Sequence, residues 1–269
     1  MTNPHYDEIR EKVNARLLDH APTGSLSAVV GDALLHGKRL RPILVFLTGE
    51  MFGAKHEDLL DAACALEMVH VASLLLDDLP SMDNGVIRHG MAALHLKHGE
   101  GTAILGAVSL MSRAFNILSD DQDNGWMLTD SLSFALTRLA DGQADDLQAD
   151  PNGATSDEIE DIYLDKTAAL FLSAVEFGAQ IGKAINIEWS CLTEYALGLG
   201  VAFQIADDLR KDTSKKSLRQ HQPNYVFCVG EAAARKRIAE LVERACFSLV
   251  PLGERAEPLI KFAGMIEGV

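Results

Sequence analysis

Basic residues and cysteines are both scarce in this chain of 269 residues. There are 24 Lys and Arg against 39 Asp and Glu, which gives a formal net charge of −15. Such an excess of negative charge repels nucleic acids and anionic membrane surfaces, so we expect no nucleic-acid partner. An anionic ligand would need either a local cluster of basic side chains or a bound cation.

The four cysteines are too widely scattered for a zinc-type pair or a dense disulfide framework. The N-terminus, MTNPHYDEIREKV, lacks a basic start followed by an apolar stretch. No later segment sustains the roughly 18 uncharged apolar residues of a membrane span. We therefore expect reduced thiols, a cytoplasmic protein and no stable membrane insertion.

Strands are also absent from the sequence pattern, because apolar residues recur at spacings of three and four and rarely alternate. No linker rich in Ser, Pro or Gly divides the chain, and Thr155 to Glu158 is typical of a helix N-terminus. The sequence predicts an all-α fold, a single large helical bundle in one domain over residues 1–269. The expected helices cover 5–19, 26–36, 41–53, 57–79, 101–118, 126–149, 156–183, 188–212, 231–249 and 254–266.

A first acidic cluster, Asp77, Asp78 and Asp83, stands at the end of a long apolar segment. Carboxylates are disfavoured at the negative end of a helix dipole, and adjacent ones repel each other, so a positive group should compensate them. Pro80 prevents the helix from continuing undisturbed. Asp83 can therefore fold back toward Asp77.

A second acidic cluster, Asp207, Asp208 and Asp212, again follows a strongly apolar segment. Asp208 and Asp212 are four residues apart and would share one helix face, one turn after Gln204. Either cluster alone is more often a solvated helix end. Two such clusters favour a metal site, and oxygen-only ligands suit Mg²⁺ held together with substrate phosphates.

A basic segment, GKRLRP at 37–42, places three cations in four residues at the start of an expected helix. A helix N-terminus combined with Lys and Arg can hold a phosphate group. By itself the segment would be interpreted as a solvated charge run. Together with the acidic clusters it predicts a second anion site that needs no metal.

Six motifs, in this order along almost the whole chain, resemble the trans-isoprenyl diphosphate synthase family. Its short-chain members are the farnesyl and geranylgeranyl diphosphate synthases. The motifs are GKRLRP at 37–42, ALEMVHVASLLLDDLPSMDN at 65–84, RHG at 88–90, GQADDL at 142–147, LDKTAALF at 164–171 and GVAFQIADDL at 200–209. The resemblance implies a bundle whose two aspartate motifs face each other across a central cavity, usually in a homodimer.

The resemblance also implies roles for individual residues, with three Mg²⁺ ions around an allylic diphosphate. The expected metal ligands are Asp77, Asp78, Asp83 and Asp207, with Asp208 and Asp212 as further candidates. The residues expected to act in catalysis are Asp77, Asp78, Lys166 and Asp207. Isopentenyl diphosphate would be held by Lys38, Arg41 and His70, and the allylic diphosphate by Arg88 and His89, supported by Lys166, Thr167 and Gln204.

Helical geometry supports part of this assignment independently. His70 and Asp77 are seven residues apart, which is two turns, so they project from one face. Glu67, Ser73 and Leu74 complete the same stripe. A lone histidine on such a face is more often a core residue, but this one shares its stripe with an aspartate pair.

The implied reaction starts with ionisation of the allylic diphosphate, which Mg²⁺ assists electrostatically. The alkene of isopentenyl diphosphate then attacks the allylic cation, and a proton is lost. Ala72 and Ser73 stand five and four residues before Asp77, and bacterial farnesyl synthases of this type generally carry an aromatic residue at the former position. Alanine leaves the channel about one helical turn deeper, roughly 5.4 Å, so we expect the C20 product, geranylgeranyl diphosphate.

Some positions depart from the family pattern. His89 stands where the family usually has a second arginine, so one phosphate contact would depend on pH. Lys211 occupies the position of the usual third aspartate of the second motif. The third aspartate is displaced by one residue to Asp212, and a shift of one residue along a helix rotates the side chain by about 100°.

Three alternatives remain open. The chain could be a farnesyl diphosphate synthase, or a non-catalytic regulatory subunit that keeps the fold. A subunit of that kind should have lost its first aspartates, which this chain retains. A terpene cyclase would not bind a second diphosphate, and the GKRLRP segment argues against it.

Overall fold

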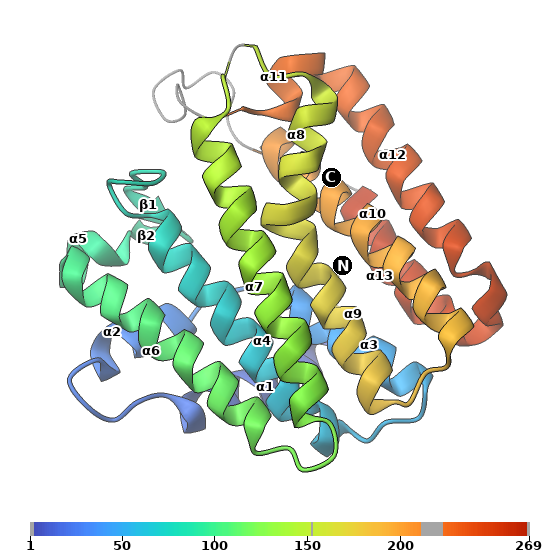
Figure 1. Cartoon of the computed structure of the whole chain (residues 1–269), viewed down its shortest axis with the longest axis horizontal. Coiled ribbons are helices and arrows are strands. Elements are labelled where there is room, and N and C mark those ends of the chain that lie inside the picture. The colour runs from blue at the N-terminus through green and yellow to red at the C-terminus, as the bar shows by residue number, and fades with distance from the viewer. Residues whose placement is uncertain (1–2, 152, 211–222, 268–269) are drawn as a thin grey trace.

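The computed structural model describes residues 3–151, 153–210 and 223–267, most of which are helical (Figure 1). The long helices α4, α6, α7, α9, α10 and α12 run side by side through the molecule. The helices are α1 (Pro4–His20), α2 (Ser27–Leu34), α3 (Leu40–Met51), α4 (His56–Asp77), α5 (Leu94–His98), α6 (Glu100–Ser119), α7 (Gly125–Gln148), α8 (Ser156–Tyr163), the π-helical η1 (Leu164–Ala168), α9 (Ala169–Ile181), α10 (Asn186–Arg210), α11 (Tyr225–Val229), α12 (Glu231–Ser248), the 3₁₀ segment η2 (Val250–Ala256) and α13 (Glu257–Glu267).

Helix α4 lies at the centre of the bundle. It packs against α1, α3, α6 and α9, so apolar residues surround it on nearly every side. One continuous core of buried side chains reaches from Tyr6 in α1 to Ile266 in α13. The predicted all-α class is confirmed.

The prediction that there is no strand is wrong for four residues. Strand β1 (Ile87–Arg88) pairs antiparallel with β2 (Met91–Ala92). The two residues between them, His89 and Gly90, have φ angles of 52° and 79°, the left-handed conformation that two-residue hairpin turns need. Strands of two residues are too short to show an alternating pattern in the sequence.

The segment expected as one helix over 156–183 is divided into three. It begins as predicted, because the Thr155 hydroxyl accepts a hydrogen bond from the Glu158 N–H and the Glu158 carboxylate accepts one from the Thr155 N–H. The middle of the segment is then wound as a π-helix, η1. Such single π turns inside α-helices occur frequently at functional sites.

Among the described residues, two helices, α4 and α6, are long and apolar enough to cross a membrane by length and composition alone. In α4, 67% of the apolar window is buried inside the protein, which explains its composition by packing in the bundle. In α6 the buried share is 39%, because one face of that helix is open at the surface.

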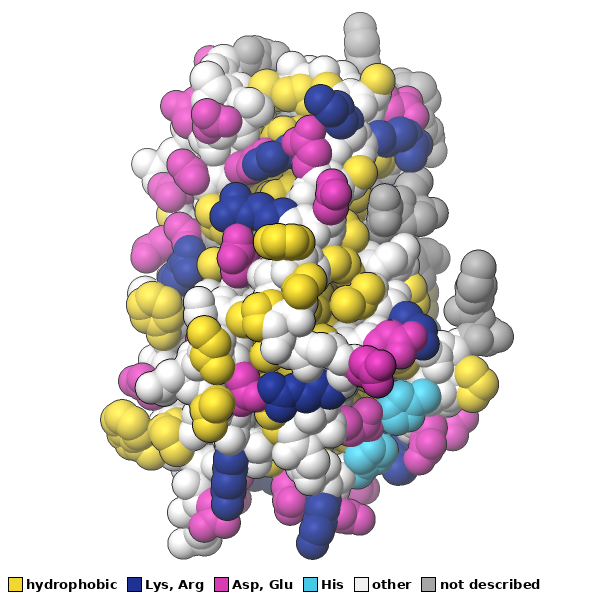
Figure 2. All heavy atoms as spheres, turned by 90° about the vertical axis from the view of Figure 1, so that its right-hand side faces the viewer, with side chains coloured by type: hydrophobic (Ala, Val, Ile, Leu, Met, Phe, Trp, Pro, Cys, Tyr) yellow, Lys and Arg dark blue, Asp and Glu magenta, His cyan; other side chains and the backbone are white. Residues whose placement is uncertain are grey.

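The outer surface in Figure 2, on the side of the molecule where α12 lies, intersperses acidic, basic and apolar side chains. Basic side chains on this face stand beside acidic ones and form no continuous basic patch among the residues that are coloured. This face therefore offers no extended surface for a polyanion.

Helices α3 and α9 approach each other closely at a glycine. A Cβ atom on Gly178 would lie 2.5 Å from the carbonyl oxygen of Val45 and 2.7 Å from the backbone nitrogen of Gly49. Both atoms belong to the backbone of α3 and cannot move aside separately. The contact positions α3, which begins at Leu40 within the basic segment.

We predict that Gly178→Ala lowers the free energy of unfolding by about 2 kcal/mol or more, because the added methyl group forces α3 and α9 apart. Gly264→Ala in α13 is the matched control, since nothing lies within 4 Å of its added Cβ. That change should raise stability by about 0.5–1 kcal/mol through helix propensity. Urea unfolding followed by circular dichroism measures both, and equal stability of the two variants would contradict the prediction.

Candidate functional site: a cavity with an acidic and a basic end

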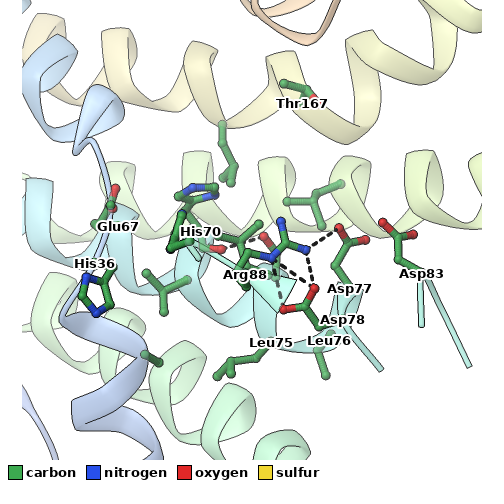
Figure 3. Close-up of a pocket in the computed structure, with 18 of the residues that line it drawn as sticks. His36, Glu67, His70, Leu75, Leu76, Asp77, Asp78, Asp83, Arg88 and Thr167 are labelled. Carbon is green, nitrogen blue, oxygen red and sulfur yellow. Dashed lines mark hydrogen bonds and ion pairs between the residues drawn. The ribbon is translucent and has the colours of Figure 1, made fainter. Parts of the chain in front are cut away.

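A cavity of about 830 Å³ opens between α3, α4, the β hairpin, α7, η1 and α10. The stripe predicted on α4 lies along this cavity, since Glu67, His70, Ser73, Leu74 and Asp77 all line it. In Figure 3 the labelled side chains follow one another from Glu67 past His70 and Arg88 to Asp77 and Asp83, with Thr167 on the opposite wall. One end of the cavity, near Glu67, is called the basic end because Lys38 and Arg41 line it. The other end, at Asp77 and Asp83, is the acidic end.

The chain folds back after α4, as predicted from Pro80. The Asp83 N–H donates to the Asp77 carbonyl oxygen at 2.9 Å, and the Gly85 N–H donates to the Asp78 carbonyl oxygen at 3.1 Å. A Cβ at position 85 would lie 2.5 Å from the Asp78 carboxylate, so a side chain there would displace this carboxylate. The turn brings Asp83 to the same cavity as Asp77.

Arg88 of β1 supplies the positive charge that the first acidic cluster requires. Its guanidinium donates to Asp78 at 2.5 to 3.1 Å and lies 3.7 Å from Asp77. Burial alone would lower the pKa of Arg88, but the hydrogen bonds and charge of Asp78, with Asp77 and Asp83, raise it. The guanidinium therefore stays charged at the acidic end.

Lys166 of η1 is the second cation at this end. Its Nζ lies 2.5 Å from Asp146 and 3.7 Å from Asp77. Burial opposes the charge, but the attraction of Asp77, Asp146 and Asp83 raises the pKa of Lys166. Sequence reasoning did not assign Asp146, although it lies in the quoted GQADDL motif; it is buried and fixes the ammonium group.

The π turn places Lys166 and Thr167 on the cavity wall next to α7. Gly142 of α7 lies against this turn so closely that a Cβ there would overlap the backbone nitrogen of Lys166. The Thr167 hydroxyl donates to the Gln204 side-chain oxygen at 2.8 Å, which joins η1 to α10. Lys166, Thr167 and Gln204 are thus brought together as predicted.

The second acidic cluster is only partly at the cavity. Asp207 lines it, but Asp208 does not. Asp208 is 2% exposed and accepts hydrogen bonds from the Tyr163 hydroxyl and, at 3.2 Å, from the Tyr225 N–H. Consecutive residues of a helix point about 100° apart, so the interpretation of Asp208 as a cavity ligand is corrected to a structural contact with α8 and α11. Asp212 lies outside the described residues.

The basic end is formed by the GKRLRP segment, as predicted, and α3 begins within this segment at Leu40. Lys38 is exposed, whereas Arg41 is buried; both line the cavity. The Arg41 guanidinium carbon lies 4.9 Å from the centre of the Phe171 ring, and its Nε is buried without a hydrogen-bond partner among the described residues. Burial lowers the pKa of Arg41 to about 10, and the charge of Glu67 opposes that shift.

Three histidines, His36, His70 and His89, line the same cavity. Burial, followed by the charges of Arg41 and Arg88, lowers the pKa of His70 well below its ordinary value, so its imidazole is neutral near pH 7. Burial and the neighbouring Arg88 also lower the pKa of His89, in the hairpin turn. His70 can thus donate one hydrogen bond to an anion as a neutral ring.

The two predicted chain-length residues are placed differently. Ser73 lines the cavity, and its hydroxyl donates to the His70 carbonyl oxygen at 2.7 Å. Ala72 is fully buried in the core and is not part of the cavity wall. Because α4 is packed on nearly every side, position along the helix did not suffice to place Ala72 at the channel floor. The wall beyond Ser73 is formed instead by Leu74, Met111, Leu136, Leu139 and Leu170.

The acidic end has a donor set that suits a hard cation bound jointly with a ligand. Asp77, Asp83 and Asp207 line one cavity and offer only oxygen atoms. Within the described part of the chain, no three His, Cys, Asp or Glu side chains converge closely enough to hold a metal ion by themselves. Mg²⁺ commonly binds in this way, through one or two carboxylates, several waters and substrate phosphates.

Comparisons with known proteins agree with the motifs. The sequence model of the polyprenyl synthetase family matches residues 25–220 of this chain. The chain is 38% identical to the farnesyl diphosphate synthase of Escherichia coli K12 in an alignment of 242 residues that covers 83% of this chain and 81% of that protein. It is 33% identical to the geranylgeranyl diphosphate synthase of Pantoea ananas over 262 residues, 91% of this chain and 87% of that protein.

A solved structure has the same architecture. The apo crystal structure of an FPP/GFPP synthase from Zymomonas mobilis superimposes with a TM-score of 0.88 and 29% identity, covering 98% of both chains. The predicted family resemblance is confirmed by these matches. The chain therefore belongs to the polyprenyl synthetase family, a family of prenyltransferases.

Proposed function

We propose that this protein is a short-chain trans-prenyltransferase that condenses isopentenyl diphosphate with an allylic diphosphate, in the presence of Mg²⁺, to give geranylgeranyl diphosphate. One observation carries the proposal: a single cavity is lined both by carboxylates from two helices, Asp77 of α4 and Asp207 of α10, and by the cations Lys38 and Arg41. Two diphosphates can bind there in different ways, one through metal ions and one directly.

The basic end suits the diphosphate of isopentenyl diphosphate. Lys38 is exposed to the cavity, and the buried Nε of Arg41 is a donor that has no partner among the described residues. Buried donors of this kind cost free energy unless a ligand accepts from them. The neutral ring of His70 adds a third donor without adding charge.

The acidic end suits the allylic diphosphate. Asp77, Asp78, Asp83 and Asp207 all line the cavity and would hold Mg²⁺, which supplies charge neutralisation for the departing diphosphate. Arg88 and Lys166 stand beside these carboxylates and can donate directly to phosphate oxygens. As the diphosphate leaves, their fixed positive charge stabilises the negative charge that develops on it.

The middle of the cavity protects the allylic cation from water. Leu74, Leu136, Leu139 and Leu170 line it, and Phe203 is its one aromatic residue among the described residues. Apolar walls exclude water that would otherwise quench the cation. Ser73 is small, so no ring closes the cavity at this position, which supports a C20 product over the alternative C15 product.

Assembly as a homodimer is part of the proposal. The surfaces of α6 and α7 expose Leu105 (57%), Val108 and Phe134 (63%), and exposed apolar patches of this kind mark interaction surfaces. A second copy of the chain would cover these side chains. We further propose that the enzyme acts in the cytoplasm, as expected from the sequence.

We predict elongation of farnesyl diphosphate by isopentenyl diphosphate with Mg²⁺, measured as diphosphate release and by chromatography of the products. Asp77→Asn should lower kcat by at least about 10²-fold because it removes charge that a metal ion needs. Lys38→Ala should mainly raise the KM for isopentenyl diphosphate, by about tenfold, through loss of one charge-assisted hydrogen bond. Wild-type protein that releases no diphosphate would favour a non-catalytic subunit.

Ser73→Phe should shorten the main product from C20 to C15, since the ring would enter the cavity beside Leu74. Ser73→Ala is the matched control, because it removes the same hydroxyl without filling the cavity, and its product should stay C20. Mass spectrometry of the dephosphorylated alcohols distinguishes the lengths. If the Phe variant still makes mainly C20 chains, Ser73 does not limit product length.

His70 should make folding sensitive to acid. The unfolded chain takes up a proton at His70 near pH 6.5, whereas burial holds the pKa of the folded form well below this value. The stability from neutral His70 is therefore present above pH 6.5 and is lost as the pH falls below it, by up to about 1.4 kcal/mol per pH unit.

His70→Gln should consequently flatten the fall in unfolding free energy between pH 6.5 and 5, measured by urea titration at several pH values. His5→Gln, which removes a histidine outside the cavity, is the control for the loss of one titrating ring. Parallel pH curves for wild type and His70→Gln would contradict the predicted shift.

A further inference from the structure

Arg39 stands between Lys38 and Arg41 in the basic segment, yet its guanidinium is used differently. The residue is 2% exposed. Its Nε donates to the Asn14 side chain at 2.8 Å, and its Nη1 donates to the His36 carbonyl oxygen at 3.0 Å. Nη2 donates to the Leu34 carbonyl oxygen at the end of α2. Arg39 therefore ties α1 and the end of α2 to the start of α3.

The fourth contact of Arg39 is a buried ion pair with Glu67 of α4. Nη1 lies 2.9 Å from Glu67 Oε1, and both side chains are almost completely buried. Glu67 Oε2 has no hydrogen-bond partner among the described residues. This carboxylate lines the basic end of the cavity, three residues before His70. The negative charge of Glu67 also acts on the neighbouring Arg41, where it favours the protonated guanidinium.

The backbone of the segment is shaped around this pair. Arg39 has φ 54°, in the left-handed region, and Gly37 has φ 140°. A Cβ on Gly37 would lie 2.7 Å from Arg39 Nη1 and 3.4 Å from Glu67 Oε1. Residues with side chains rarely adopt such conformations unless surrounding contacts hold them there. The loop that presents Lys38 is thus wrapped around the Arg39 guanidinium.

We propose that Arg39 and Glu67 form a positioning pair that holds Lys38 and Arg41 in place for the diphosphate of the non-allylic substrate. This inference rests on the proposed function. Neither residue needs to touch that substrate. The pair fixes the loop from the inside, and Glu67 offsets the repulsion among the three cations of the segment.

The sign of one substitution separates positioning from simple electrostatics. A carboxylate close to an anion site opposes anion binding by Coulomb's law, so neutralising it would by itself tighten binding. If Glu67 positions the cations, Glu67→Gln should instead weaken binding of isopentenyl diphosphate. Calorimetric titration with isopentenyl diphosphate in EDTA measures this step without metal and without turnover. We expect an increase in Kd of about tenfold, and tighter binding would overturn the proposal.

Further variants exclude a general loss of folding. Arg39→Met should weaken binding more than Arg39→Lys, which keeps the charge. The double variant Arg39→Met/Glu67→Leu removes both buried charges and should stay folded, since apolar replacements of such pairs are often neutral for stability. It should still raise the KM for isopentenyl diphosphate about tenfold, with kcat and the allylic KM within about twofold of wild type. Wild-type affinity in this folded double variant would overturn the proposal.

The matched control is a second ion pair to α4, which comes from Arg16 of α1. Arg16 donates to Asp61 at 2.7 and 2.9 Å, away from the cavity. Arg16→Met should leave the binding of isopentenyl diphosphate unchanged, and weakening equal to that of Arg39→Met would overturn the specific role of Arg39. Wild-type elongation with unaltered binding in every variant refutes the positioning pair alone. Wild-type protein that neither elongates nor binds isopentenyl diphosphate refutes the proposed function as well.

Discussion

The structure depends on balancing like charges that are crowded into a partly buried cavity. Asp77 and Asp78 follow each other at the negative end of α4, where the helix dipole disfavours both. Arg88 and Lys166 approach them from β1 and η1, and Asp146 fixes the ammonium group on its far side. Without these cations the carboxylates would repel each other. The end of α4 would also lose the ion pair that joins Asp78 to Arg88 of β1.

This balance also suits the proposed chemistry. Arg88 and Lys166 already stand beside the proposed position of the allylic diphosphate. Their side chains therefore need little rearrangement when negative charge develops on the leaving group. Asp77 and Asp78 are paired with cations, and among the described residues no three carboxylates converge closely enough to hold a metal ion. A metal ion would bind together with its phosphate ligand, which couples metal binding to substrate binding.

Close backbone packing sets the positions of these charges. Gly142 allows η1 to approach α7, and the π turn directs Lys166 and Thr167 into the cavity. At the other end, Gly178 allows α9 to approach α3. A change at either glycine would move a functional side chain without touching it, because backbone atoms in the contact cannot shift alone.

The sequence by itself determined the helical class, the family and most of the polar residues that line the cavity. Spacing along one helix was sufficient for Glu67, His70, Ser73 and Asp77, because helical periodicity fixes which side chains share a face. Motif resemblance added Lys166, Thr167 and Gln204 on other helices. The first set follows from spacing within one helix and the second from resemblance to family motifs. Neither required knowledge of how the helices of this chain pack together.

Only the tertiary structure decided which of two adjacent residues faces the cavity. Asp207 lines it while Asp208 contacts Tyr163, and Ser73 lines it while Ala72 is buried in the core. It also showed that the Arg39 guanidinium is held in a buried ion pair with Glu67, although Arg39 lines the same cavity as Lys38 and Arg41. The rotation of each helix about its axis depends on contacts with several other helices, and those contacts join residues far apart in the chain.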